Sequence, residues 1–161
     1  MTLSVEYRLL SVDALLIHEQ IVPERVGELV RDIRAQGAVV EPILVARGSH
    51  VILNGHHRFA ALRQMGARRI PAWVVDYEDD AIVLERWYDG PPLSKAEVVE
   101  RARDRRPFTP KTTKHLLKEA LPSHPTRLDE LLDAEGRSDA PPRRAQGGTS
   151  SGRRGASGSS D

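Results

Sequence analysis

Residues 51–62 read Val-Ile-Leu-Asn-Gly-His-His-Arg-Phe-Ala-Ala-Leu. The three leading apolar residues predict a short buried strand, and Asn54-Gly55 predicts a sharp turn after it. The residues that follow have helical spacing, with Phe59 and Leu62 on one face, and Gly66 ends the pattern. This part of the chain is therefore expected to fold as a strand, a turn and a helix.

The expected turn places two imidazoles and a guanidinium, from His56, His57 and Arg58, on the first turn of the helix. Free backbone N–H groups and the positive end of the helix dipole lie there, so the position favours an anion such as a phosphate. Gly55 lets the backbone approach a ligand closely, and Arg58 can bind phosphate oxygens through two hydrogen bonds. The residues alone are also compatible with a polar helix start that binds nothing, because strand–turn–helix units are common.

The same residues carry a resemblance to a known family. A strand, then Asn54-Gly55-His56-His57-Arg58, then an apolar helix resembles the phosphate-binding box of the ParB/sulfiredoxin-like fold, and the double histidine is similar to that of its free-serine kinases. Leu16-Ile17-His18-Glu19 precedes a helix expected over Pro23–Gln36, at the place where those kinases carry a catalytic glutamate. Pro110–His115 is similar to their P-K-T/S-T-R-H box. The resemblance covers the chain from Leu10 to Leu117, and three motifs in order are more specific than any one of them.

The resemblance implies a kinase that transfers a phosphoryl group from ATP or ADP to a free amino acid, with L-serine expected and O-phospho-L-serine as product. Glu19, which by itself would pass for a surface carboxylate, would be the catalytic base that accepts the hydroxyl proton. His18 would support or pack against it. Nucleotide and phosphate contacts are expected from Asn54, Gly55, His56, His57, Arg58 and Lys111. Contacts to the amino-acid substrate are expected from Trp87, Thr112, Thr113 and His115.

Magnesium is expected on charge grounds, since a nucleotide brings several negative charges that protein donors alone rarely offset. The residue expected to help hold Mg²⁺ is Asn54, where the free-serine kinases usually have aspartate. An amide oxygen can coordinate a metal but brings no charge. A zinc site at His56 and His57 is not expected, because adjacent helical residues point about 100° apart and chelate poorly.

The main alternative is a ParB-like nucleotide-binding or DNA-associated regulator without kinase activity. Partition-type proteins usually carry G-E-R-R where this chain has residues 55–58, and they continue into a helix-turn-helix and a dimerisation domain, for which we expect no room before the tail. A non-catalytic nucleotide-binding module stays open as a third interpretation because of Asn54.

Composition narrows the class of protein. The chain has 161 residues, 39% of them hydrophobic, and no cysteine, which excludes disulfides, thiolate metal sites and the thiol chemistry of sulfiredoxin. No run of eighteen apolar residues and no basic flank before an apolar region is present, so we expect no membrane contact and a cytoplasmic location. Residues 136–161 carry a net charge of +3, which leaves −2 for residues 1–135 of the total of +1. A nearly neutral domain does not favour nucleic acid as a partner, and we expect a monomer or weak homodimer that binds a nucleotide and a free amino acid.

The remaining pattern predicts a small α/β (α+β) domain with a mixed sheet over residues 1–120, a short helical extension over 121–135 and a disordered Gly/Ser/Arg-rich tail over 136–161. Strands are expected at Tyr7–Ser11, Ile43–Ala46, Val51–Leu53, Ile70–Val75 and Ile82–Trp87. A capping box at Ser94–Glu97 predicts a helix to about Arg105, and a further short helix is expected from about Thr126 to Ala134. Pro107 and Pro110 predict an extended loop that presents Lys111–His115.

Overall fold

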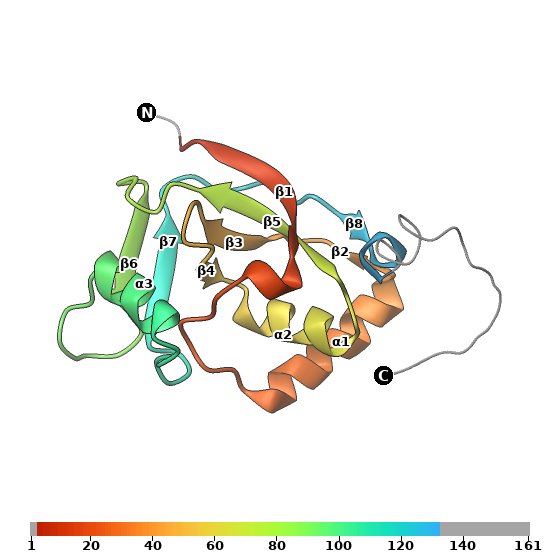
Figure 1. The fold of residues 1–161 in the computed structure, drawn as a ribbon, viewed down its shortest axis with the longest axis horizontal. Coiled ribbons are helices and arrows are strands. Elements are labelled where there is room, and N and C mark those ends of the chain that lie inside the picture. Colours follow the sequence, from red (N-terminus) through yellow and green to blue (C-terminus); the bar gives the residue numbers. More distant parts are fainter. Residues whose placement is uncertain (1–2, 133–161) are drawn as a thin grey trace.

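The computed structural model describes residues 3–132 and centres on a four-stranded sheet (Figure 1). Its strands are β1 (Val5–Ser11), β3 (Ile43–Ala46), β4 (Ile52–Asn54) and β5 (Arg69–Val75), in the order β1-β5-β3-β4. β1 pairs antiparallel with β5, β5 pairs parallel with β3, and β3 pairs antiparallel with β4. The mixed sheet expected from the sequence is therefore confirmed, and the strands predicted at Ile43–Ala46 and Val51–Leu53 pair with each other as a hairpin.

Helices pack around this sheet. They include η1 (Val12–Ala14), α1 (Pro23–Gln36), α2 (His56–Gln64) and α3 (Lys95–Arg103), and residues 128–132 are also helical. Two small antiparallel pairs complete the described part of the fold: β2 (Ala38–Val39) with β8 (Thr126–Arg127), and β6 (Ile82–Arg86) with β7 (Thr113–Leu117). Figure 1 shows β6, β7 and α3 together at one end of the molecule, away from α1.

Two hydrophobic clusters lie on opposite sides of the sheet, and β3 contributes to both. Ile43 and Val45 belong to the cluster that also contains buried residues of α1 and α2. Leu44 and Ala46 alternate with them and belong to a cluster with residues of β6 and α3. Because successive side chains of a strand point to opposite faces, a strand buried on both sides is apolar throughout, as Ile43–Ala46 is.

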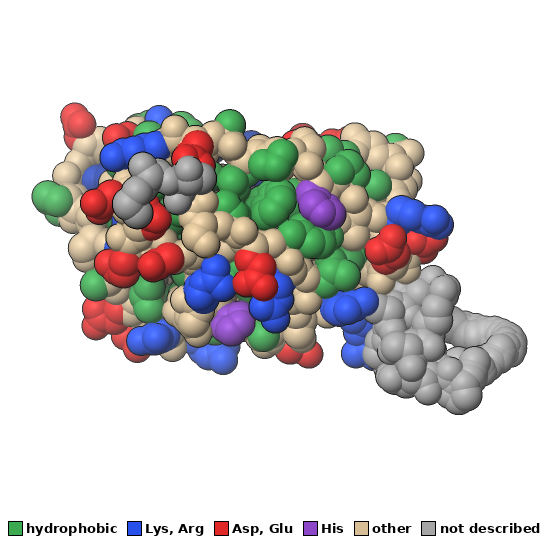
Figure 2. Space-filling model, turned by 90° about the horizontal axis from the view of Figure 1, so that it is seen from above, with side chains coloured by type: hydrophobic (Ala, Val, Ile, Leu, Met, Phe, Trp, Pro, Cys, Tyr) green, Lys and Arg blue, Asp and Glu red, His purple; other side chains and the backbone are tan. Residues whose placement is uncertain are grey.

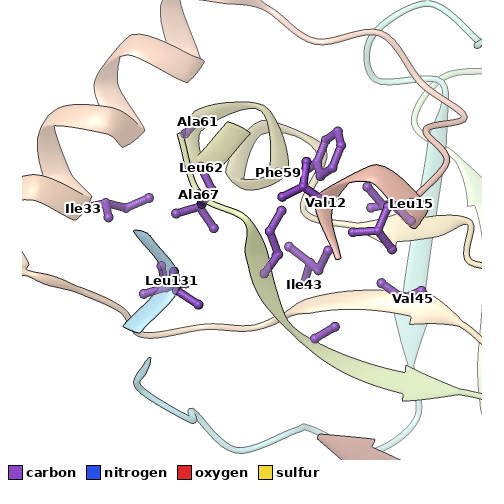
Figure 3. Close-up of a cluster of buried hydrophobic side chains, with 14 of the residues drawn as sticks. Val12, Leu15, Ile33, Ile43, Val45, Phe59, Ala61, Leu62, Ala67 and Leu131 are labelled. Carbon is purple, nitrogen blue, oxygen red and sulfur yellow. The ribbon is translucent and has the colours of Figure 1, made fainter. Parts of the chain in front are cut away.

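Figure 3 shows the first cluster, which fixes the position of α2. Phe59 and Leu62, the apolar residues three positions apart on this helix, are 5% and 0% exposed. They pack with Val12 and Ile43, and α1 contributes Ile33 from the other side. The helix start at residues 55–58 is thus held by a well-packed core directly behind it.

A separate aromatic cluster lies on the β1–β5 pair. The rings of Tyr7 and His124 stack with centroids 3.6 Å apart, and Trp73 meets His124 edge-on at 5.8 Å. The Tyr7 hydroxyl lies 2.6 Å from Oγ1 of Thr126. Figure 2 shows hydrophobic side chains gathered around a histidine on the face seen from above. These contacts attach the segment that leads into β8 to the sheet.

Most expected elements are found near their predicted bounds. The helix over Pro23–Gln36 and the strand over Ile43–Ala46 are confirmed, and so is the strand predicted from Ile82. The loop expected over Lys111–His115 is wrong from Thr113 on, because Thr113–Leu117 forms β7 and pairs with β6. The helix expected from Thr126 begins later, since Thr126 and Arg127 form β8 and the described helical residues are 128–132. The predicted tail over 136–161 lies outside the described residues.

No helix within residues 3–132 is both long enough and apolar enough to cross a bilayer.

Candidate active site

The turn between β4 and α2 leaves the start of α2 open. Gly55 is the N-cap residue with φ 101°, and the helix has no side-chain hydrogen bond at this cap. A Cβ atom at position 55 would lie 2.6 Å from Cγ2 of Ile43, so only glycine fits there. The N–H groups of the first turn are consequently not capped by a side chain and can bind an anion.

Arg58 lies in this first turn, and its guanidinium is half-buried. One of its terminal nitrogens would lie 3.3 Å from a Cβ at Gly55, which places the cation beside the turn. Within residues 3–132 it makes no hydrogen bond or ion pair. Burial lowers the pKa of Arg58, while the charge of Glu41 opposes that shift. A partly buried cation without an acceptor, beside uncapped N–H groups, has the properties of an anion site.

Glu19 is held by three donors from the far end of the described chain. The N–H of Lys111 donates to Oε2 at 2.8 Å, and the N–H of Thr113 donates to Oε1 at 3.0 Å. The Thr113 hydroxyl also donates to Oε1, at 2.6 Å. Backbone bonds between residues 18–20 and Phe108, both of 2.8 Å, join the two segments. The carboxylate is therefore fixed in one orientation, with an unused lone pair on Oε2.

His18 connects Glu19 to the sheet. Its imidazole is fully buried, with Nδ1 2.7 Å from the carbonyl oxygen of Ile52 and Nε2 2.8 Å from Oγ1 of Thr113. Burial lowers the pKa of His18, and both the Ile52 bond and the charge of Glu19 act in the opposite direction. The supporting role expected for His18 agrees with this placement.

The two imidazoles of α2 accept hydrogen bonds from the backbone. Nε2 of His56 accepts from the N–H of His18 at 3.2 Å, and Nε2 of His57 accepts from the N–H of Val22 at 2.9 Å. Because Nε2 of each ring accepts an N–H, each ring carries its proton on Nδ1. Burial lowers the pKa of His57 and lowers that of His56 strongly, which agrees with neutral rings. Each ring therefore has at most one donor, Nδ1, left for the phosphate contact expected from the sequence.

Thr113 and His115, expected as substrate contacts, have partners inside the protein. The Thr113 side chain is 7% exposed and lies between Glu19 and His18. Nε2 of His115 lies 2.7 Å from the Tyr77 hydroxyl, and a hydrogen bond to the backbone of Leu53 involves the same ring. Burial lowers the pKa of His115 to about 3. The role of Tyr77 could not be found from the sequence, because it depends on β7 lying beside β6.

Trp87 reaches the same region from the end of β6. Its side chain is 48% exposed, and Nζ of Lys111 and of Lys114 lie 5.7 and 4.8 Å from its ring centroid. The backbone N–H of Trp87 donates to the carbonyl of Thr112 at 3.4 Å. The Thr112 hydroxyl donates a hydrogen bond to the carbonyl oxygen of Thr109 at 2.8 Å. Trp87 thus lies against Lys111 and Thr112, from which it is distant in sequence, and Lys111 in turn contacts Glu19.

A cleft of about 630 Å³ lies along α2 and is lined mainly by apolar residues such as Ile17 and Phe59, with Arg63 and Arg105 among the polar ones. His56 borders it, but Glu19 and Arg58 do not. The carboxylate of Glu19 and the guanidinium of Arg58 therefore lie outside this cleft.

Comparison with known proteins identifies the family. The model of the ParB N-terminal domain matches residues 5–85, about half of the chain, and the protein belongs to this family. The ATP-dependent L-serine kinase of Staphylothermus marinus is 41% identical over 88 residues, which cover 52% of this chain and 35% of that protein. The ADP-dependent L-serine kinase of Thermococcus kodakarensis is 31% identical over 106 residues, which cover 63% of this chain and 44% of that protein.

Solved structures agree on the fold. A free serine kinase in complex with AMP superimposes with a TM-score of 0.72 at 18% identity, covering 78% of this chain and 93% of the other. The ParB/sulfiredoxin-like fold expected from the sequence is thereby confirmed, and the curated relatives above bear out the resemblance to free-serine kinases. The chain spans less than half the length of the two curated kinases that it matches.

Proposed function

We propose that this protein is a kinase that transfers the terminal phosphoryl group of ATP or ADP to the hydroxyl of free L-serine, giving O-phospho-L-serine. The observation that carries the proposal is the pairing of two features: a carboxylate fixed by three donors, and an uncapped helix start with a free arginine. The two features are joined directly, since Nε2 of His56 in the first turn of α2 accepts the N–H of His18, the residue before Glu19, at 3.2 Å. The names of the curated relatives support the same reaction.

In the proposed reaction the substrate hydroxyl donates its proton to Glu19 as its oxygen attacks the terminal phosphorus. The bond from that phosphorus to the bridging oxygen of the nucleotide breaks, and the shorter nucleotide leaves with the electron pair. Oε2 of Glu19 has a lone pair free for the proton, because among residues 3–132 only the N–H of Lys111 donates to it. The donors on Glu19 are fixed before the substrate arrives, so the base needs no reorientation.

The phosphates of the nucleotide would bind the N–H groups that follow Gly55 and the guanidinium of Arg58. Both are available in the structure, and both favour negative charge. The amino acid would lie between Glu19 and Trp87, with the ammonium group of Lys111 near enough to bind a carboxylate or phosphate. We propose that the protein acts in the cytoplasm as a monomer or weak homodimer, without nucleic acid.

Magnesium fits this site only as an ion bound mainly through phosphate oxygens. Within residues 3–132 no three histidine, aspartate or glutamate side chains form a metal-binding group. Asn54 is exposed at the end of β4 and offers one amide oxygen next to the phosphate position. A bound Mg²⁺ would offset phosphate charge during transfer.

The test is direct product analysis. Purified protein is incubated with ATP or ADP, Mg²⁺ and a panel of serine, threonine and homoserine, and phospho-amino acids are quantified. We expect phosphoserine from the wild type and a loss of about a hundredfold or more in Glu19→Gln, whose amide cannot accept the proton. Glu24→Gln, an exposed glutamate in the first turn of α1, is the matched control and should keep full activity. If the wild type binds nucleotide but phosphorylates none of the panel, a nucleotide-binding regulator becomes the better interpretation.

A further inference from the structure

A buried hydrogen-bonded chain leads from β4 to Glu19. It runs from the carbonyl of Ile52 to Nδ1 of His18 (2.7 Å), from Nε2 of His18 to Oγ1 of Thr113 (2.8 Å), and from Oγ1 to Oε1 of Glu19 (2.6 Å). A carbonyl oxygen can only accept, so Nδ1 of His18 carries the proton of the neutral ring. Nε2 of His18 is then an acceptor.

This assignment leaves one hydroxyl proton for two acceptors. Thr113 can donate either to the carboxylate of Glu19 or to Nε2 of His18, and both lie within hydrogen-bond distance. While Glu19 is ionised, the charge-assisted bond to the carboxylate is the stronger of the two. Nε2 of His18, fully buried, is then without a donor, which is a costly state for a buried polar atom.

The groups around the chain favour a neutral His18. His56 of α2 and His115 of β7 face it edge-on, with ring centroids at 4.5 and 5.5 Å. Both are neutral, because burial lowers the pKa of each. Glu19 accepts the backbone N–H of Lys111, and its charge also acts on His57, whose Nε2 accepts the N–H of Val22.

We infer that His18 is a positioning residue for the base: when Glu19 takes up the proton of the substrate hydroxyl, the hydroxyl of Thr113 turns from Glu19 to Nε2 of His18. The inference rests on the proposed function, in which Glu19 is that base. Only one proton is transferred, from the substrate oxygen to Glu19. Thr113 keeps its hydroxyl proton, and His18 stays neutral. The donor that stabilises the carboxylate is withdrawn as the charge disappears, and it satisfies the buried nitrogen instead.

Removing the His18 imidazole and removing the Thr113 hydroxyl should therefore shift the protonation of Glu19 in opposite directions. In His18→Phe the Thr113 hydroxyl can donate only to Glu19, so the ionised carboxylate is favoured over its protonated form more than in the wild type. In Thr113→Val the carboxylate loses its charge-assisted donor. We expect the acidic limb of the pH profile of kcat/KM to move to lower pH in the first variant and to higher pH in the second. The value of kcat should fall about tenfold in His18→Phe, as for the loss of one hydrogen bond between neutral groups, because the Thr113 hydroxyl can no longer turn to Nε2 of His18.

Two variants serve as controls. Thr113→Ser keeps the hydroxyl and should keep the wild-type profile. His50→Phe applies the same substitution at a histidine in the β3–β4 turn and should leave the profile unchanged. Nucleotide affinity should be unaltered in all four proteins. Shifts of the same sign in His18→Phe and Thr113→Val, or no shift in either, would overturn the inference.

A second measurement needs no activity and does not depend on the folding of His18→Phe. In ¹⁵N-labelled wild-type protein we expect a neutral His18 with its proton on Nδ1, and an Nε2 resonance that moves towards a hydrogen-bonded value as Glu19 is protonated at low pH. Protonation of Nε2 itself in this step, or an unchanged Nε2 resonance, would contradict the hydroxyl switch. A wild type that forms no phospho-amino acid would reject the proposed function, and this spectrum would still decide the role of His18.

Discussion

The two helices α2 and α3 begin in opposite ways. In α3, Oγ of Ser94 accepts the N–H of Glu97 at 3.0 Å, and Glu97 adds a negative charge in the first turn. In α2, Gly55 supplies no side chain, no acidic residue lies in the first turn, and Arg58 adds a positive charge. At the start of α3, neighbouring side chains cap the helix and offset its dipole. The start of α2 instead has backbone N–H groups that no side chain caps, and a cation at the positive end of the dipole. A helix start of the second kind is stabilised by an anionic ligand.

The largest effect on either helix start, in both stability and nucleotide affinity, is expected from Gly55→Ala at the start of α2. A Cβ at this position would lie 2.6 Å from Ile43, and φ of 101° is strained for alanine. The free energy of unfolding should fall by roughly 2–4 kcal/mol, the sum of overpacking and backbone strain. Nucleotide affinity should be lost as the turn shifts. Gly66→Ala is the control, since Gly66 has φ 88° but nothing within 4 Å, and it should cost only the strain of about 1 kcal/mol. Equal losses in both variants, measured by urea unfolding, would mean that Ile43 does not restrict the turn.

Arg58→Ala should weaken nucleotide binding by about tenfold to a hundredfold, the range for hydrogen bonds to charged groups. The ligand-free protein should lose little stability, because Arg58 has no partner within the described residues. Calorimetric titration with ATP and ADP measures the first effect and thermal unfolding the second. Arg34→Ala, in the last turn of α1, is the control and should change neither. Unchanged affinity in Arg58→Ala would remove the phosphate role of this turn.

Ser94→Ala should produce the reverse pattern at the other helix. Loss of the cap typically costs about 1 kcal/mol, and nucleotide affinity should not change because α3 does not contribute to the phosphate position. Ser94→Asp restores an acceptor at the cap and should recover the stability. A drop in nucleotide affinity in Ser94→Ala would show that the two helix starts are coupled.

The smallest effect is expected from Asn54→Asp, which adds a negative charge next to the open start of α2. Without Mg²⁺ the new carboxylate should compete with phosphate, so nucleotide affinity should fall a few-fold. With Mg²⁺ the carboxylate is a better ligand than the amide, so affinity and the rate at limiting Mg²⁺ should rise. A magnesium titration of both proteins distinguishes these signs. The same response with and without the metal would place residue 54 away from it.

The start of α2 was predictable because every signal for it is local. An apolar strand, Asn-Gly and the spacing of Phe59 and Leu62 all lie within a dozen residues. The donors on Glu19 were not predictable from the residues, since Lys111 and Thr113 are 92 and 94 positions away. β7 was mistaken for a loop because nearby prolines dominate the local pattern, whereas its pairing with β6 is non-local. Strands of two residues, such as β2, are too short to show any periodicity.

The hydrogen bonds from Lys111 and Thr113 to Glu19 also have a consequence for the order of folding. Residues 5–85, the part that matches the ParB N-terminal domain, include Glu19, Gly55 and Arg58 but none of the donors to the carboxylate. Contacts across more than ninety residues form only after a large loop has closed, which slows their formation relative to hairpins and helix pairs. The turn at Gly55 and Arg58 can therefore assemble early, while the carboxylate of Glu19 acquires its fixed geometry only when the segment before β7 docks. Amide hydrogen exchange at Lys111 and Thr113 would report this last step, and under the proposed function a nascent chain would acquire its phosphate-binding turn before its base is in place.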